Sequence, residues 1–358
     1  MSSNTHIDLS EIFFRNQQLF LYFGFWKLDP YSKFKFVYSF YTCFGFGLII
    51  LFLLPLILHM IANANDIMEV KCRKHFEIGK KAEAFGHSLF FFGILLGLFT
   101  QLFWCLKPLF ENERTLPTKA WYPYNSSVTP YFEITTGCQT ISIAYTIFHI
   151  INIDSFAKNL LIAIGAQCDI LTYTLEHLNQ FETVKGVLRM KEDSLKLSDQ
   201  KFTRKMKDNL KQCIQHYVEV KRITKMVEDV YHIAFLALFI GGGFIFCTIL
   251  YQLLRIKVGS TEFFYLLFYF FAMFTQQSGF CWIGTELTFK SSRIFNAIPK
   301  IPYWLDCDLE FRKMMVIAFL SVKEPLVIHA GRLIPLSIQV FLNVLRTSYS
   351  YFTLLSNI

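Results

Sequence analysis

The stretch FLNVLRTSYSYFTLLSNI, residues 341–358, closes the chain and decides how the rest is interpreted. As a helix rising about 1.5 Å per residue, it is long enough to span most of a bilayer. It also carries Arg346 and several Asn, Ser and Thr side chains, which must face other helices or water. Two interpretations stay open from this pattern: a packed bundle helix, or a helix that lines a pore or aqueous cavity.

The composition of the whole chain is that of a polytopic membrane protein. Of its 358 residues 53% are hydrophobic and only 17% are charged, against roughly 25% charged in soluble domains. The net charge of +8 lies in loops between apolar runs, so it is a signal of membrane orientation and not a nucleic-acid surface. The nine cysteines are scattered singly, which predicts neither a zinc site nor a disulfide framework.

The apolar runs predict an all-α helix bundle with six transmembrane helices and cytoplasmic helical extensions. Uncharged residues 36–65 are the first span, and 66–83 are a charged connector. The expected organisation is an interfacial segment at 1–35, three spans at 36–169, a cytoplasmic helical section at 170–229, a transmembrane hairpin at 230–285, a cytoplasmic connector at 286–324 and a last span at 325–358.

Two segments outside the spans are expected to be helical. In the section 170–229, apolar residues recur at steps of three and four and predict an amphipathic helix that continues into the next span: Met206, Leu210, Cys213, Tyr217, Val220, Ile223 and Val227. Its apolar stripe requires a neighbouring helix outside the membrane. Residues 314–322 are too short to cross a bilayer, so they predict a buried or interfacial helix.

Gly241, Gly242 and Gly243 lie inside a predicted span, with no strand before them and no Lys-Ser/Thr after them. They therefore predict a kink or a close helix contact and not a phosphate loop. The basic sections are expected to be cytoplasmic, which places the turn at 255–261, the C-terminus and the loop 107–130 outside. Asn125 begins a glycosylation sequon in that loop. By alternation the N-terminus is also outside. Six spans with the C-terminus outside exclude the usual G-protein-coupled plan, which needs seven spans and an inside C-terminus.

Several stretches together resemble insect odorant receptors. These are Leu116-Pro117, Trp121-Tyr122-Pro123-Tyr124-Asn125, the span containing Gln139 that leads to Asp154, Pro325-Leu326, and Thr347-Ser-Tyr-Ser-Tyr-Phe-Thr-Leu-Leu355. The resemblance covers nearly the whole chain. It implies a seven-helix, ligand-gated cation channel of four subunits, in which an odorant-binding subunit acts with a shared olfactory co-receptor in the plasma membrane of the sensory dendrite.

The resemblance also implies roles for residues of the last helix. The family's hydrophobic gate falls at Leu354 and its polar pore position at Asn357, and Arg346 and Ser350 are further pore candidates on the same helix. The family has seven spans, however, and here the Trp-Tyr-Pro motif follows the second span instead of the third. The chain is therefore expected to lack the equivalent of the family's second helix.

The ligand implied is a small volatile molecule, whose pocket should be aromatic with few polar groups. The candidates lie in the outer halves of three spans: Thr100, Trp104, Tyr131, Thr135, Gln139, Tyr265, Phe268, Tyr269 and Met273. No cofactor, metal or catalytic constellation is expected. The alternatives are a gustatory-type chemoreceptor, a secondary transporter, for which no inverted repeat is visible, and a short receptor form that does not conduct.

Overall fold

A computed structural model describes residues 72–110, 128–184, 187–190 and 199–356 of the chain. The segment 1–35, the predicted first span at 36–65, the Trp-Tyr-Pro loop with Asn125, and Asn357 lie outside the described residues. Predictions for those positions, including the missing second helix, therefore stay predictions.

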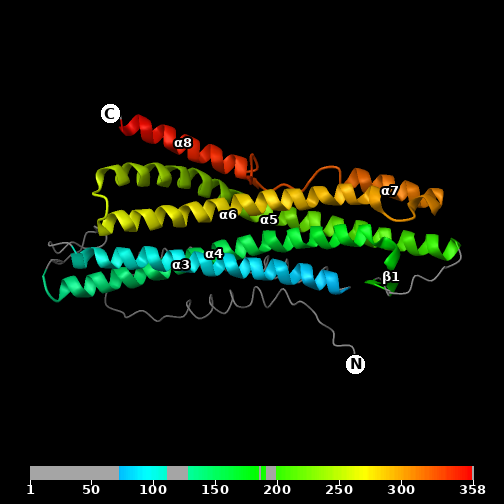
Figure 1. Ribbon diagram of the computed structural model, residues 1–358, viewed down its shortest axis with the longest axis horizontal. Helices are drawn as coiled ribbons and strands as arrows, with labels where there is room; N and C mark the ends of the chain where they lie inside the picture. Colours follow the sequence, from blue (N-terminus) through cyan, green and yellow to red (C-terminus); the bar gives the residue numbers. More distant parts are fainter. Residues whose placement is uncertain (1–71, 111–127, 185–186, 191–198, 357–358) are drawn as a thin grey trace, which may run out of the picture. The chain divides into compact units, whose positions relative to one another are not determined.

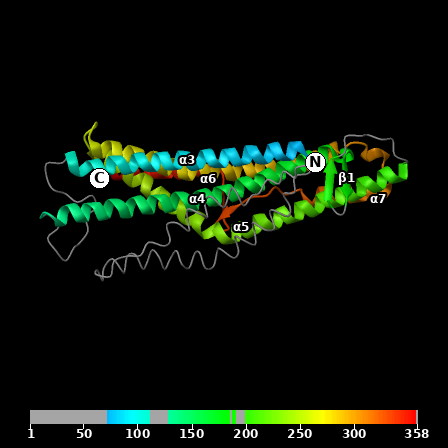
Figure 2. The same cartoon turned by 90° about the horizontal axis from the view of Figure 1, so that it is seen from below.

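The described part of the chain is dominated by long helices, as the sequence predicts (Figures 1 and 2). The helices are α3 (Arg73–Phe110), α4 (Tyr131–Glu176), α5 (Asp199–Arg255), α6 (Thr261–Ala297), α7 (Leu309–Ser321) and α8 (Ile338–Ser356). Short 3-10 turns occupy Leu178–Gln180, Ile298–Lys300 and Trp304–Asp306. The all-α prediction is thus confirmed.

Two short antiparallel hairpins were not predicted from the sequence. β1 (Phe181–Val184) pairs with β2 (Val187–Met190), and β3 (His329–Ala330) pairs with β4 (Ile334–Pro335). Gly331 and Arg332 in the second turn have φ values of 60° and 61°, the left-handed region that a tight reversal requires. This hairpin occupies the start of the predicted last span, so the helix begins at Ile338 and not near Pro325.

Among the described residues, three helices are long and apolar enough to cross a membrane: Arg73–Cys105, Tyr131–Glu176 and Lys201–Arg255. The other two predicted spans, 263–285 and the closing run, form helices α6 and α8 at the expected positions. Gln276 and Gln277 in α6, and the Ser and Thr residues of α8, lower the hydropathy of these two helices. Their membrane crossing stays a prediction.

Helix α3 begins earlier than predicted, since residues 73–83 were expected to form a charged connector. In the structure they are the first turns of α3. Lys74 and Glu77 stand three residues apart and their side chains lie 3.1 Å from each other, and the Lys80 ammonium lies 4.8 Å from the ring centre of Phe76. Such pairs along one helix face stabilise helical structure, so the charges that indicated a loop instead lie on a helix.

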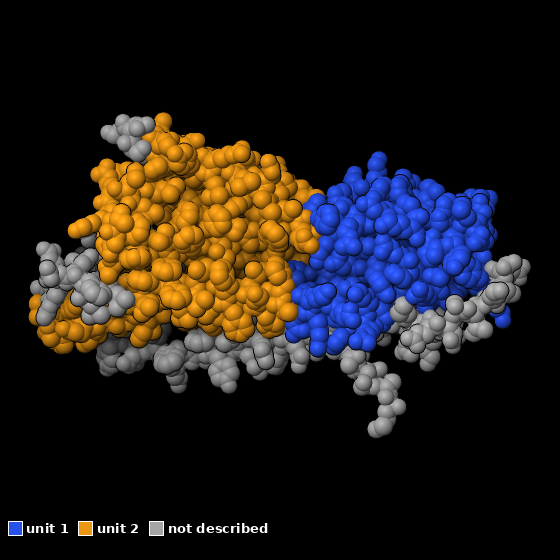
Figure 3. All heavy atoms as spheres, viewed as in Figure 1, with its two compact units in different colours: residues 1–83, 162–230, 287–326 blue, residues 84–161, 231–286, 327–358 orange. Residues whose placement is uncertain are grey.

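The described chain divides into two compact units (Figure 3). Unit 1 contains the described parts of 1–83, 162–230 and 287–326, and unit 2 contains those of 84–161, 231–286 and 327–358. The divisions fall close to the limits between the charged and the apolar sections of the sequence. Unit 1 contains most of the described residues predicted to be cytoplasmic, and unit 2 most of those predicted to be spans. Where either unit lies relative to a membrane stays a prediction.

The core of unit 1 confirms the amphipathic helix. α5 runs without a break from Asp199 to Arg255, and its predicted stripe is buried at all seven positions from Met206 to Val227. The predicted short helix is α7, which buries Phe311, Met315 and Ala318. The core of unit 2 includes Phe246, Phe280 and Cys281.

Candidate functional site

The last helix, α8, has an exposed polar face within unit 2. Asn343, Arg346, Thr347 and Ser350 are all exposed, and Leu354 at the end of the same face has 62% of its surface exposed. These residues recur at three- and four-residue steps, so they share one face of the helix. The sequence candidates Arg346, Ser350 and Leu354 therefore lie together.

The opposite face of α8 packs against α5 and α6. The ring of Phe341 meets that of Phe274 edge to face, with 5.1 Å between ring centres. Further along, the hydroxyl of Ser348, only 3% exposed, donates a hydrogen bond to the Gly243 carbonyl of α5 at 3.0 Å. One face of the helix is thus held while the polar face stays open.

The beginning of α8 is held by the middle of α6. The backbone N–H of Ile338 donates to the Thr285 hydroxyl at 3.0 Å, which satisfies one of the unpaired donors at a helix N-terminus. Next to it, Gly284 has no side chain, and a Cβ there would lie 2.4 Å from the Leu336 carbonyl oxygen. The backbone leading into α8 can approach α6 this closely only because residue 284 is glycine.

Two of the three glycines of α5, Gly242 and Gly243, form close helix contacts, one of the two outcomes predicted from the sequence. Gln277 of α6 is fully buried, and its amide nitrogen donates to the Leu238 carbonyl at 2.7 Å. A Cβ on Gly242 would lie 1.2 Å from that nitrogen, so the glycine supplies the space for the amide. The Gly243 carbonyl accepts the hydrogen bond from Ser348 of α8. Two consecutive glycines of α5 therefore contact α6 and α8, respectively.

The odorant-pocket candidates are brought together in part. Phe268 of α6 stacks on two rings of α3, those of Phe99 and Phe103, at centre distances of 5.4 and 5.1 Å. Tyr265 and Tyr269 stack on each other with 6.1 Å between their ring centres. This part of unit 2 is therefore rich in aromatic rings, as a pocket for a small apolar molecule requires.

The remaining candidates lie in different surroundings. Trp104 and Thr135 are buried, and the buried hydroxyl of Thr100 donates to the Leu96 carbonyl of its own helix at 2.9 Å. Tyr131, at the start of α4, is 52% exposed. Gln139 and Met273 are half-buried. Whether any of these side chains touches a ligand stays a prediction.

Polar contacts that the sequence analysis missed connect α3 with α4 and α4 with α6. Gln101 donates to the Thr140 carbonyl at 3.2 Å. Gln276 donates to the carboxylate of Asp154. Gln101 and Gln276 both interrupt predicted spans, so a polar amide in an apolar run was the available signal.

Ion pairs connect the helices of unit 1. Asp169 of α4 lies 2.8 Å from the Lys290 ammonium of α6. Lys207 of α5 bridges Asp308, at 2.6 Å, and Glu310 at the start of α7. The Lys207 ammonium and a backbone N–H lower the pKa of Asp308 below its usual value, because both donate to the charged carboxylate.

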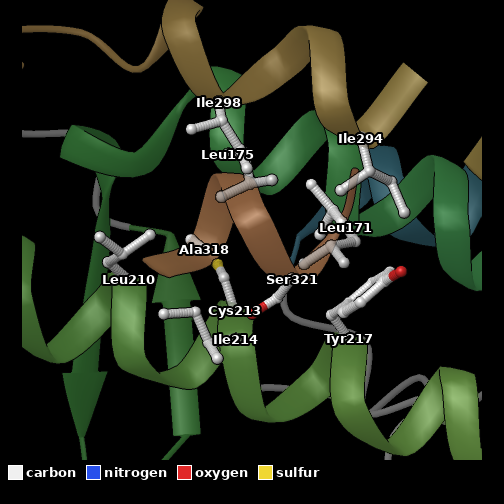
Figure 4. Close-up of a pocket in the computed structure, with 11 residues that line it drawn as sticks. Leu171, Leu175, Leu210, Cys213, Ile214, Tyr217, Ile294, Ile298, Ala318 and Ser321 are labelled. Carbon is white, nitrogen blue, oxygen red and sulfur yellow. The ribbon is translucent and has the colours of Figure 1, made fainter. Parts of the chain in front are cut away.

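A small cavity lies in unit 1 where four elements meet (Figure 4). Its volume is about 20 Å³, and residues from α4, α5, α7 and the end of α6 surround it. In Figure 4 the sulfur of Cys213 points from α5 toward Ala318 of α7. This space admits about one water molecule, whereas small-molecule pockets span roughly 300–1,000 Å³. The cavity is a packing feature and not an odorant site.

A sequence model of the family described as "7tm Odorant receptor" matches residues 34–349 of the chain. The chain belongs to the odorant receptor family. This confirms the resemblance seen in the sequence, and it identifies a membrane receptor family and not an enzyme family. It also favours the odorant branch over the gustatory alternative.

Individual odorant receptors show the same relationship. Odorant receptor Or1 of Anopheles gambiae is 23% identical over 75% of this chain and 66% of its own length. Odorant receptor Or2 of the same organism is 30% identical over 42% of this chain and 39% of its own length. Odorant receptor 33a of Drosophila melanogaster is 22% identical over 69% of this chain and 61% of its own length. The matches thus span less than two thirds of each of these three receptors.

The fold is that of solved insect olfactory receptors. The receptor OR5 from Machilis hrabei, determined in complex with eugenol, superposes with a TM-score of 0.70 over 98% of this chain and 99% of its own, at 16% identity. A second structure of OR5 gives a TM-score of 0.69 over 87% of this chain and 77% of its own, at 18% identity. At these identities the likeness concerns the fold alone.

Proposed function

We propose that this odorant receptor is a subunit of an odour-gated, non-selective cation channel, acting with a shared co-receptor subunit in the plasma membrane of olfactory neuron dendrites. The observation that carries the proposal is the exposed polar face of α8, which ends at Leu354. A helix at the lipid surface would not retain Asn343, Arg346 and Ser350 on one open face, because each side chain would lose its hydrogen bonds in hydrocarbon.

The chemistry of this face suits a gated water-filled pore. When several subunits place it around one axis, the polar side chains are hydrated and Leu354 narrows the path. A hydrophobic constriction stops ions because it excludes water, and polar neighbours let hydrated cations pass once it widens. Arg346 is exposed on this face. If the same face of identical helices packed closely together, their Arg346 charges would be brought together and repel each other, so a water-filled space between the helices is favoured over a packed interface.

The ligand proposed is a small volatile molecule bound among the aromatic side chains of α3 and α6. The stacked rings of Phe99, Phe103 and Phe268 present the apolar faces that such a molecule requires. The similar structure of OR5 was determined with eugenol, which supports a small organic ligand here without identifying it.

The test is electrical recording from cells that express the chain together with the co-receptor. A panel of volatile alcohols, esters and phenols is applied to the wild type and to Leu354→Ala. Leu254→Ala is the matched control, because Leu254 of α5 has a nearly identical exposure of 64%. The expected result is a cation current evoked by at least one compound, with a larger ligand-free current in Leu354→Ala only.

Two outcomes contradict the proposal. If Leu354→Ala and Leu254→Ala conduct alike, α8 does not carry the gate. If the wild type gives no current beside a functioning seven-helix receptor, although it reaches the cell surface, the chain is a receptor form that does not conduct.

A further inference from the structure

Burial along α8 changes at Ser348. Before that residue the helix is held by buried Phe341 and by Ser348 itself. From Tyr349 to Leu354 none of the side chains is buried, and Tyr349, Tyr351 and Leu354 are each about 60% exposed (60%, 61% and 62%). The contact between Ser348 and α5 is therefore the last buried attachment, in the described chain, before the proposed gate.

This attachment is a hydrogen bond made directly to a helix backbone. The single hydroxyl proton of Ser348 is shared between the Gly243 carbonyl at 3.0 Å and the Val344 carbonyl of its own helix at 2.8 Å. A Cβ on Gly243 would lie 3.7 Å from the Ser348 oxygen, which is ordinary contact distance. Ser348 and Gly243 are both small residues, so the two helices approach each other closely here, at a contact around which a helix can tilt.

Gln277 places a second constraint one residue away on α5. Its amide nitrogen holds the Leu238 carbonyl, in the space left by Gly242. The amide oxygen of Gln277 is buried and has no hydrogen-bond partner within the described ranges. A buried polar group of this kind requires an explanation, and a second position of α6 that satisfies this oxygen would provide one.

Gln277 also lies on the same stripe of α6 as the pocket candidates. Tyr265, Tyr269, Met273 and Gln277 follow one another at four-residue spacing, which aligns them along one side of a helix. A displacement of α6 caused by a ligand at the tyrosines would therefore move Gln277 with it, because the helix between them is continuous.

We propose that the Ser348–Gly243 contact is the pivot about which the gate-bearing end of α8 moves, and that Gln277 is the positioning residue that transmits displacements of α6 to it through α5. This inference deepens the proposed function and rests on it. In the working channel the pivot contact is kept in both the closed and the open arrangement, while the segment from Tyr349 to Leu354 changes position.

The first experiment tests the contact without relying on channel activity. Gly243→Cys and Ser348→Cys are combined in the full chain, membranes are treated with a mild oxidant, and linked peptides are identified by mass spectrometry. Each single cysteine variant is the control for the native thiols at Cys247 and Cys281. We expect a cross-link in the double variant only, since the separation is compatible with disulfide geometry. Its absence would overturn the pivot.

The same double variant tests the motion. Odour-evoked current, recorded with the most active compound of the panel, should persist after oxidation, because a pivot can be fixed while the end of the helix moves. If oxidation abolishes the current and a reductant restores it, α8 must separate from α5 at this point, and the proposal is wrong.

The second experiment measures coupling with single hydrogen-bond deletions. Ser348→Ala should raise the half-activating concentration several-fold at unchanged surface expression, because displacements of α6 then reach the end of α8 without their pivot. A hydrogen bond kept in both arrangements does not by itself shift the balance between them. The control is Thr248→Ala, since the exposed Thr248 hydroxyl bonds only to Ile245 within α5. An unchanged half-activating concentration would show that Ser348 takes no part in the coupling. A lowered one would show that the contact stabilises the closed state, which contradicts a contact kept in both arrangements.

Gln277→Met keeps the length of the side chain and removes its donor. It should shift the half-activating concentration in the same direction as Ser348→Ala, and the double variant should shift it by less than the product of the two, because both act on one route. If the double variant shifts the half-activating concentration by the full product of the two single shifts, the two residues act independently and Gln277 does not act through the Ser348 contact. If the wild type gives no odour-evoked current, the proposed function is contradicted. If the wild type responds but neither variant changes the half-activating concentration, only this inference is contradicted.

Discussion

Gly284→Ala is the substitution for which the structure gives the clearest steric expectation. A Cβ at residue 284 would lie 2.4 Å from the Leu336 carbonyl oxygen and 2.7 Å from the Leu336 Cβ. Neither atom is the end of a flexible side chain. The backbone entering α8 must therefore move away from α6 by roughly 0.8 Å to restore a contact of about 3.2 Å.

The displacement acts on the hydrogen bond beside it. Ile338 N–H and the Thr285 hydroxyl are 3.0 Å apart, so a movement of that size brings the pair beyond hydrogen-bonding distance. Overpacking costs about 1–3 kcal/mol, and the lost bond adds about 1 kcal/mol. Alanine returns up to about 1 kcal/mol through its higher helix propensity. The net destabilisation expected is about 1–3 kcal/mol.

The assay is thermal unfolding of the detergent-solubilised chain. Unfolding is monitored as the fraction of protein that still elutes as a folded species after heating. The control is Gly241→Ala, since no described atom lies within 4 Å of a Cβ at residue 241. Gly284→Ala should lower the midpoint by about 1–4 °C, while Gly241→Ala should leave it unchanged or raise it slightly. Equal midpoints for the two variants would refute the steric argument.

Two further predictions concern unit 1. Lys207 lowers the pKa of Asp308, so the stabilisation from this carboxylate is complete above the usual Asp pKa of about 3.9 and is lost as the pH falls through the lowered pKa. Asp308→Asn should therefore remove part of the acid sensitivity of the unfolding midpoint, measured between about pH 5 and 3. An unchanged pH profile of the midpoint would contradict this assignment. Ser291→Ala leaves the buried Leu326 N–H without the acceptor that now lies 2.9 Å away, which costs about 1–3 kcal/mol. The unfolding midpoint of Ser291→Ala should therefore fall below that of the control Ser292→Ala, because the Ser292 hydroxyl bonds to Phe289 within α6. Equal midpoints for the two variants would contradict this prediction.

The elements that could be predicted are those with a long repeating pattern. The apolar stripe from Met206 to Val227 predicted one face of α5, because a period near 3.6 over many residues is unlikely to arise by chance in a loop. The short apolar patch at 314–322 predicted α7, which spans Leu309–Ser321. The brief polar turn at 255–261 matches the end of α5 at Arg255 and the start of α6 at Thr261.

The elements that could not be predicted depend on contacts distant in sequence. Strands of two to four residues such as β3 and β4 carry no measurable periodicity. The pairing of Gln277 with Gly242 requires the register between two helices, which one sequence does not contain. A signal was nevertheless present at each partner, since a glycine run and a pair of glutamines both interrupt apolar spans.

The attachments of α8 also explain why glycine and hydroxyl residues occur where they do. In lipid the hydrophobic effect does not drive helices together, so association depends on close packing and hydrogen bonds. Gly243 and Gly284 permit the close approach, and Ser348 and Thr285 supply hydrogen bonds at the same two places. These contacts lie on one face and on the first part of the helix, and the polar face toward Leu354 is exposed. Under the proposed function, water and further subunits cover this face.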